Sequence, residues 1–291
     1  MSATPPAASA SPATPLARWQ HWCARRHAEL ASPDSWLGLI GLTWLEPGRN
    51  RVGSAADGTV VLPDGPAHLG DLLWDGSDGE HLVWQAAPGS PAVVEGGEGP
   101  AIEGAGITLA TDARGTPSTV TAGDLHFFVI ARDGRLAVRL RDRAWQRHHP
   151  FAGLDYFAFD PAWQVDAAWE RLDPPQILEV PTVTGELKAV QVSGQAVFER
   201  DGQRNALLPM EEGEDGYFFV FRDLGAGRDT YGAGRFLHAA PPREGRLVLD
   251  FNRAYNPPCA FTPFATCPLP PPENWLKIAI PAGEKKYAGH Y

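Results

Sequence analysis

The chain has 291 residues, of which 43% are hydrophobic and 21% charged, and its formal net charge at pH 7 is -10. This length fits one large domain or two closely packed ones, and the apolar content excludes a disordered protein. The excess of negative charge argues against nucleic-acid and anionic-membrane partners, because lysine and arginine dominate binding to both. An uncharged apolar run of about 18 residues, which a membrane span needs, is missing from the sequence.

Residues 1–15 consist mainly of alanine, proline, serine and threonine, and this composition predicts a disordered tail. The prolines interrupt every apolar stretch that a secretory signal would need, so we expect a cytoplasmic protein. The three cysteines, Cys23, Cys259 and Cys267, are too few for a disulfide framework. Reduced thiols are therefore expected.

Residues 16–145 are expected to form an N-terminal helix and a β-sandwich half. Apolar residues near helical spacing predict one amphipathic helix over residues 16–30. The apolar stretch 36–45 contains glycines and is more typical of buried extended chain than of a second helix. From residue 48 to 123, short apolar runs alternate with glycine, aspartate and proline, a pattern that indicates an antiparallel sandwich or barrel.

A hairpin is predicted over residues 125–141, where Asp133-Gly134 separates two apolar runs. The following segment, 145–169, is rich in aromatic residues and predicts an irregular connection packed between two halves, because a solvated linker would not carry so much apolar surface.

Residues 146–291 are expected to form a C-terminal β half that ends in a proline-rich clasp. Strands are predicted at 176–180, 186–192, 196–200, 217–222, 235–237 and 246–250. Seven prolines fall between Pro257 and Pro272 and predict a stiff, non-helical loop. The predicted fold class is thus mainly β, with antiparallel sandwich or barrel halves and one N-terminal helix.

Several C-terminal motifs carry a family resemblance. Asp-Phe-Asn-Arg-Ala-Tyr-Asn-Pro-Pro-Cys-Ala-Phe begins at Asp250, Cys-Pro-Leu-Pro-Pro at Cys267, Glu-Asn-Trp-Leu at Glu273 and Ala-Gly-Glu-Lys at Ala282. The sequence resembles the domain of unknown function 1684 family of uncharacterised bacterial and archaeal proteins, and the resemblance extends upstream to residues 230–237, 139–142 and 36–53. The resemblance therefore indicates which proteins are related to this chain, but it implies no particular reaction.

The candidate site draws on polar residues of this C-terminal region. The sequence suggests a small-molecule enzyme or binding protein with a pocket between the two β-rich halves. Arg235 would clamp an anionic group, and Asp250 or Glu273 would act as general acid or base. Tyr231, Asn252, Asn256 and Asn274 would bind polar substituents. Alternatively, the same residues cap turns and form a structural clasp across the sheet.

Cys259 is a further catalytic candidate, because a cysteine nucleophile needs only a histidine base nearby in the fold. The alternative, that Cys259 and Cys267 are small buried hydrophobic side chains, is favoured by the usual burial of cysteine. Seven residues separate the two, and no second cysteine pair or nearby histidine completes a zinc site, so no metal is expected. The sequence identifies no cofactor.

A second resemblance is local. Residues 45–54 and 60–65 are similar to the opening strands of forkhead-associated domains. The sequence departs from that pattern at Ser54, where such domains carry arginine, and only Pro66-Ala67-His68 stands at the later motif. The comparison therefore predicts a β-sandwich in the N-terminal half rather than phosphothreonine binding. It also keeps open a non-enzymatic module that binds a protein or peptide partner.

Overall fold

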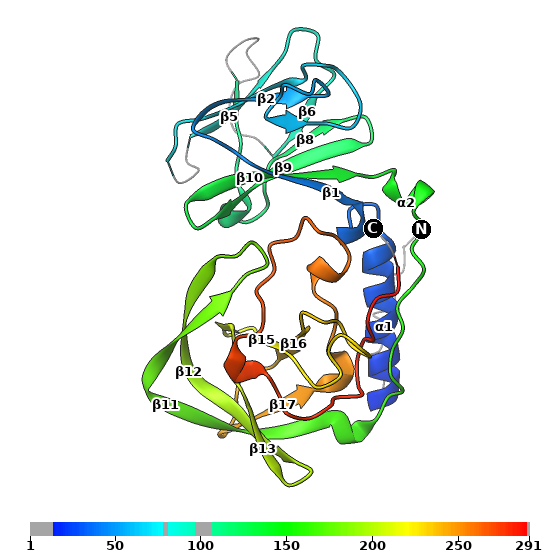
Figure 1. Cartoon of the computed structure of the whole chain (residues 1–291), viewed down its shortest axis with the longest axis vertical. Coiled ribbons are helices and arrows are strands. Elements are labelled where there is room, and N and C mark those ends of the chain that lie inside the picture. Colours follow the sequence, from blue (N-terminus) through cyan, green and yellow to red (C-terminus); the bar gives the residue numbers. More distant parts are fainter. Residues whose placement is uncertain (1–13, 78–80, 97–105, 290–291) are drawn as a thin grey trace, which may run out of the picture. The chain divides into compact units, whose positions relative to one another are not determined.

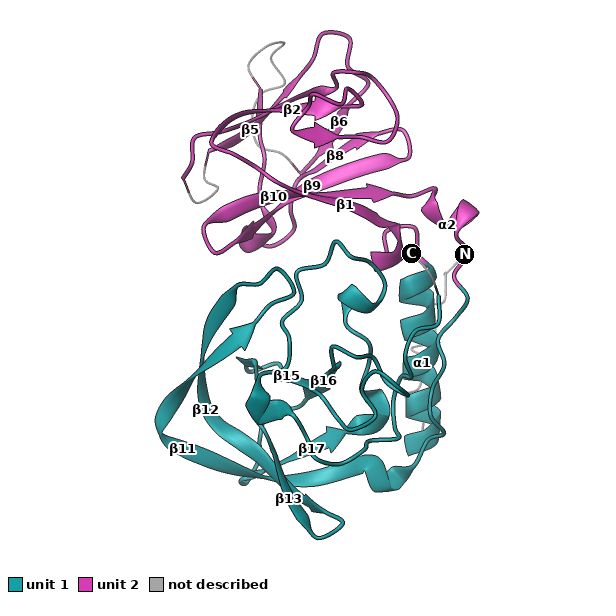
Figure 2. Ribbon diagram, in the orientation of Figure 1, with its two compact units in different colours: residues 1–31, 152–291 teal, residues 32–151 magenta. Residues whose placement is uncertain are grey.

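The computed structural model of the chain describes residues 14–77, 81–96 and 106–289. The chain divides into two compact units, coloured separately in Figure 2: unit 1 comprises Met1–Ala31 and Ala152–Tyr291, and unit 2 comprises Ser32–Phe151. Antiparallel strands dominate both units, and one long helix, α1 (Pro15–Ala31), precedes them in the sequence. The predicted fold class is thereby confirmed. The tail predicted at residues 1–15 lies outside the described residues as far as residue 13.

Unit 2 contains two five-stranded sheets (Figure 1). One sheet has the order β1-β10-β9-β8-β6, and the other has the order β3-β2-β4-β5-β7. The strands of the first sheet are β1 (Leu39–Trp44), β6 (Val93–Glu95), β8 (Thr119–Ala122), β9 (Leu125–Arg132) and β10 (Arg135–Asp142). Those of the second are β2 (Gly48–Gly53), β3 (Val60–Val61), β4 (Gly70–Trp74), β5 (Leu82–Ala86) and β7 (Ile107–Thr108). The short helix α2 (Trp145–His148) follows the last strand.

The hairpin of β9 and β10 confirms the strongest local prediction from the sequence. Val129 pairs with Val138 across it. Both turn residues have positive φ, 48° at Asp133 and 75° at Gly134, which is the backbone that an Asp-Gly hairpin turn requires. Val129 and Val138 are buried in the core of unit 2 with Trp84, whose ring meets Phe127 edge-on at 5.5 Å.

Unit 1 contains a four-stranded sheet of order β13-β12-β11-β17 and a three-stranded sheet of order β14-β15-β16. The strands are β11 (Gln164–Pro181), β12 (Leu187–Arg200), β13 (Gln203–Leu207), β14 (Glu211–Glu212), β15 (Tyr217–Phe221), β16 (Arg235–Ala239) and β17 (Arg246–Asp250). The expectation of an irregular segment as far as residue 169 was wrong at its C-terminal end. There β11 begins at Gln164 and pairs with β17, because each strand places apolar residues in the same core.

The core of unit 1 is centred on Phe251, the residue after β17. Its ring packs against Phe221 at 5.4 Å, Phe198 at 5.7 Å and Trp163 at 6.1 Å. Helix α1 belongs to the same unit: Trp19 packs against Phe159 at 5.7 Å and donates its indole hydrogen to the carbonyl of Asn252 at 2.9 Å. The helix is therefore fixed to the chain that follows β17.

Candidate functional site

The segment after β17 contains most of the residues that the sequence singled out. It folds as loops with three short 3-10 helices, Phe251–Arg253, Pro258–Ala260 and Pro272–Asn274, in keeping with its prolines. Loops of this kind cannot satisfy their own backbone groups through a ladder, so side chains must do so.

Asn252 and Asp250 lie together at the start of this segment. Asn252 is 1% exposed, and its amide exchanges two hydrogen bonds with the backbone of Asp160, at 2.9 and 3.0 Å. It also donates to the Asp250 carboxylate at 3.1 Å, which accepts a further hydrogen bond from Gln164 at 3.0 Å. Arg253 lies 3.4 Å from the same carboxylate.

Asn256 and Glu284 form the next contact. The Glu284 side chain is fully buried and accepts the Asn256 backbone N–H at 2.7 Å, while the Asn256 amide donates to the carbonyl of Lys285 at 2.8 Å. Helix α1 contributes Arg26, whose Nε lies 3.0 Å from Glu284 Oε1. Burial raises the pKa of Glu284, and the positive charge of Arg26 opposes that shift.

Arg235, the predicted anion clamp, is 1% exposed on β16. Its guanidinium donates to the carbonyls of Ile280 at 3.0 Å, Glu284 at 3.3 Å and Ala282. Asp223 lies 3.6 Å away and offsets part of the burial that lowers the pKa of Arg235 to about 10. The contacts of this arginine thus fix the path of residues 280–284.

Asn274 and Glu273 are neighbours in the chain with opposite surroundings. Asn274 is fully buried, where its amide pairs with both backbone groups of Leu208 and donates to the carbonyl of Val220, each at 2.8 Å. Glu273 is exposed on the same short helix. Asn274 therefore connects β15 to the residue that follows β13, whereas the carboxylate of Glu273 meets solvent.

Cys259 and Tyr231 are in contact beside the cavity described below. The Tyr231 hydroxyl donates to the carbonyl of Cys259 at 2.8 Å. A hydrogen bond with the Cys267 thiol lowers the pKa of Cys259, and burial opposes that shift. The structure thus brings together the two cysteines whose separation in space the sequence left open.

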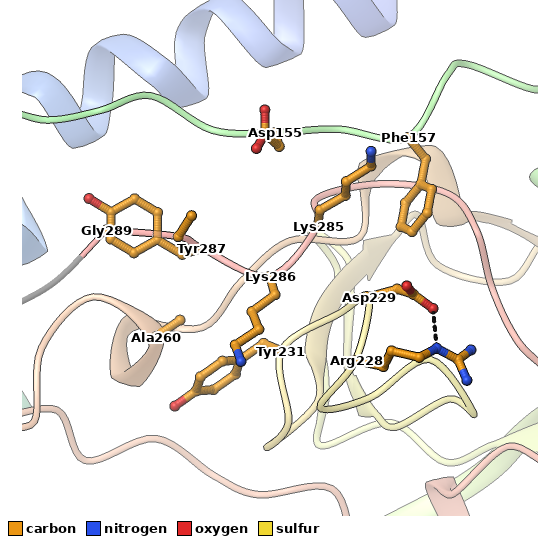
Figure 3. Close-up of a pocket in the computed structure, with 11 residues that line it drawn as sticks. Asp155, Phe157, Arg228, Asp229, Tyr231, Ala260, Lys285, Lys286, Tyr287 and Gly289 are labelled. Atoms are coloured by element: carbon orange, nitrogen blue, oxygen red, sulfur yellow. Dashed lines mark hydrogen bonds and ion pairs between the residues drawn. The ribbon is translucent and has the colours of Figure 1, made fainter.

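A cavity of about 820 Å³ opens beside Tyr231, and all of its lining residues belong to unit 1. Figure 3 shows its walls. The lining residues are Asp155, Phe157, Arg228, Asp229, Tyr231, Ala260, Lys285, Lys286, Tyr287, Ala288 and Gly289. The cavity therefore combines aromatic walls with both signs of charge.

The cationic groups of this cavity differ in their partners. Arg228 is paired with Asp229 at 2.8 Å. The Lys285 ammonium lies 5.3 Å from the centre of the Phe157 ring, and Lys286 extends on the side of Tyr231 (Figure 3). Neither lysine has a carboxylate partner within residues 14–77, 81–96 and 106–289. Two cationic groups are therefore available to a ligand.

The backbone holds the two lysines in place. The Lys285 N–H donates to the carbonyl of Asp155 at 2.8 Å, and the Lys286 N–H donates to that of Asp229 at 3.0 Å. Just before them, Gly283 has φ of 80°, and a Cβ there would lie 2.4 Å from the Ala254 carbonyl oxygen. Only glycine permits this close approach. Because of it, the backbone N–H of Glu284 donates a hydrogen bond to the Ala254 carbonyl at 2.8 Å.

Sequence reasoning found one side chain of this cavity, Tyr231, and missed its lysines. Lys285 belongs to the Ala-Gly-Glu-Lys motif, but nothing in the sequence shows that Phe157 and Asp155 line the same cavity. Within the described part of the chain, no group of three His, Cys, Asp or Glu side chains is placed to hold a metal ion.

Comparisons with known proteins give a family and no activity. Residues 149–285 match the family model described as "Protein of unknown function (DUF1684)". A solution NMR structure of an uncharacterised protein from gene locus rrnAC0354 of Haloarcula marismortui is 31% identical; the match covers 51% of this chain and 90% of that chain, with a TM-score of 0.40. Among curated proteins, none matches the chain.

No helix in the described ranges is both long enough and apolar enough to cross a membrane. The family match covers nearly all of unit 1 after α1, including Tyr231, Cys259 and Lys285. The chain belongs to the DUF1684 family of proteins of unknown function, as its C-terminal motifs predict.

Proposed function

We propose that unit 1 binds a small organic anion, a carboxylate or a phosphate ester, in the cavity beside Tyr231. The observation that carries this proposal is the pair of lysines, Lys285 and Lys286, which line the cavity without carboxylate partners among the described residues. A cation that ends in a concave site without a carboxylate partner is suited to pair with an anionic ligand.

The size and walls of the cavity favour a small molecule over a macromolecule. Its volume of about 820 Å³ lies within the range of ligand pockets, which is roughly 300 to 1,000 Å³. Phe157, Tyr231 and Tyr287 provide aromatic surface for the apolar part of such a ligand.

The charge of the lining limits how many negative charges the ligand carries. Three cationic side chains face two carboxylates, Asp155 and Asp229, and one of the cations, Arg228, is already paired. A polyanion would meet repulsion from Asp155 and Asp229. The cavity is therefore matched to a ligand with one anionic group next to an aromatic or aliphatic body.

The test is a thermal-shift and calorimetry screen of the full chain against organic carboxylates and phosphate esters. A ligand at a hundred times its Kd stabilises the protein by about 2.7 kcal/mol, which moves Tm by a few degrees. We expect at least one compound to stabilise the wild type, and affinity to fall at least tenfold in the double variant Lys285→Gln/Lys286→Gln.

Lys277→Gln is the matched control, because Lys277 is exposed and outside the cavity. It removes one positive charge by the same Lys→Gln change, away from the cavity, and should retain wild-type affinity. Equal loss in Lys277→Gln and in the double variant would show a general charge effect and overturn the proposal. Equal affinity in the wild type and the double variant, or the absence of any stabilising anion, would also overturn it.

A further inference from the structure

Cys259 and Cys267 form a thiol pair inside the proline-rich segment. Both carry reduced thiols, and the Cys267 side chain is hydrogen-bonded to that of Cys259. Both pack in one apolar cluster with Val180, Met210 and Phe236. Two thiols in hydrogen-bond contact need only a small movement to reach bonding distance.

The backbone carbonyls of the two cysteines accept hydrogen bonds from different segments of the chain. The Cys267 carbonyl accepts the N–H of Val183 at 3.0 Å, and the next residue, Pro268, is bridged to Thr182. The Cys259 carbonyl accepts the Tyr231 hydroxyl at 2.8 Å. The prolines between and around the two cysteines restrict the loop further. The fold thus keeps the two side chains opposed.

The two cysteines differ in exposure in a way that suits sequential chemistry. Cys259 is half-buried on the short helix Pro258–Ala260, next to Ala260 of the cavity wall, whereas Cys267 is 4% exposed. Of these two thiols, Cys259 is therefore the more accessible to a reagent from solution.

Cys23 provides an internal comparison. Burial raises the pKa of Cys23 to about 11, so its thiol stays protonated near neutral pH. The hydrogen bond from Cys267 lowers the pKa of Cys259 instead. Because the thiolate is the nucleophile in disulfide exchange, Cys259 is expected to react faster than Cys23.

We propose that Cys259 and Cys267 are a thiol–disulfide exchange site that closes reversibly to an intramolecular disulfide. The Cys259 thiolate attacks one sulfur of a small-molecule disulfide, forming a mixed disulfide and releasing one thiolate. The Cys267 thiol then loses its proton and attacks the Cys259 sulfur, which releases the second small thiol. Two protein thiols are oxidised by two electrons in total, and one disulfide is reduced to two thiols.

The test exposes the full-length protein to oxidised glutathione at neutral pH and counts thiols by mass spectrometry and peptide mapping. We expect the wild type to lose two of its three thiols, to carry no glutathione, and to yield a linked peptide joining Cys259 and Cys267. Reduction by dithiothreitol should restore all three thiols.

Single substitutions separate the roles of the two sulfurs. Cys267→Ser should stop at the mixed disulfide, with one glutathione on Cys259, and Cys259→Ser should leave Cys267 reduced. Cys23→Ser is the control and should form the same internal link as the wild type. The wild-type measurement needs no variant to fold. The proposal is overturned if the oxidised wild type keeps three thiols, or retains glutathione on Cys259 without a link to Cys267.

Discussion

Arg26 and Glu284, 258 positions apart in the sequence, form a buried ion pair with 3.0 Å between Nε and Oε1. The glutamate side chain is fully buried, and that of the arginine is 13% exposed. Arg26 also donates to the carbonyl of Asn256 at 2.9 Å and lies over the ring of Tyr255 at 4.8 Å. This one side chain connects helix α1 to two motifs of the C-terminal segment.

Replacing Arg26 by alanine should therefore destabilise unit 1 strongly. The change leaves the buried Glu284 without its cation, and breaking one partner of a buried pair costs about 3 to 5 kcal/mol. Urea unfolding measures the loss. Arg25→Ala is the control: that arginine is 63% exposed and pairs with Glu29 one helical turn away, so its removal should change stability by less than about 0.5 kcal/mol. Equal losses in the two variants would refute a structural role for the buried pair.

Asn274→Ala should be far more harmful than Glu273→Ala, although the two residues are adjacent. The first change removes three buried hydrogen bonds and leaves both backbone groups of Leu208 unsatisfied, at about 1 to 3 kcal/mol for each orphaned group. The second alters an exposed side chain. Thermal unfolding of the two variants checks this order, and a Glu273→Ala loss as large as that of Asn274→Ala would contradict it.

Gly283→Ala should destabilise the loop that carries the cavity lysines. The substituted residue would need φ of 80° and would place its Cβ 2.4 Å from the Ala254 carbonyl oxygen. Gly185 is a control with φ of 85° and open space around its Cβ position, so Gly185→Ala incurs only the conformational cost, about 1 to 2 kcal/mol. The expected result is a larger loss of Tm at position 283. Similar losses would show that the close backbone approach is not limiting.

The stability of unit 2 should fall as the pH drops from 6.5 towards 4 because of His126. Burial, with a contribution from the positive charge of Arg143, lowers the pKa of this histidine to about 4, against about 6.5 in an unfolded chain. Over that interval the unfolded chain binds a proton that the folded chain does not. The contribution of His126 to the free energy of unfolding is therefore fully present above pH 6.5. On the order of 3 kcal/mol of it is lost as the pH falls from 6.5 to 4.

Comparison of His126→Gln with the wild type in urea at pH 7 and pH 4.5 isolates this contribution. The variant should lose less stability between the two pH values than the wild type does. His81, whose side chain is 71% exposed, provides the control: His81→Gln should keep the wild-type pH dependence. A His126→Gln profile parallel to that of the wild type would show that another group titrates there.

The strands follow from local features of the sequence, whereas the surroundings of the candidate site residues depend on distant parts of the chain, as particular residues show. The Asp133-Gly134 turn is a local feature, because positive φ at two adjacent positions needs these residue types and no distant partner. Tyr231 was predicted as a ligand contact and does line the cavity. Arg235 has the same residue type as a substrate clamp, but its surroundings are set by the carbonyls of Ile280, Ala282 and Glu284, about 45 residues later. A sequence pattern does not show which long-range carbonyls will enclose a side chain.

The order of the elements along the chain has a consequence for biosynthesis. Helix α1 precedes all of unit 2, yet its partner Glu284 lies near the C-terminal end of unit 1. The residues of unit 2 are contiguous, so this unit can fold once residue 151 has left the ribosome. The partners of Arg26 on helix α1 are synthesised more than a hundred residues later. During that interval Arg26 lacks Tyr255, Asn256 and Glu284, so helix α1 gains these contacts to the C-terminal segment only after unit 2 has been synthesised.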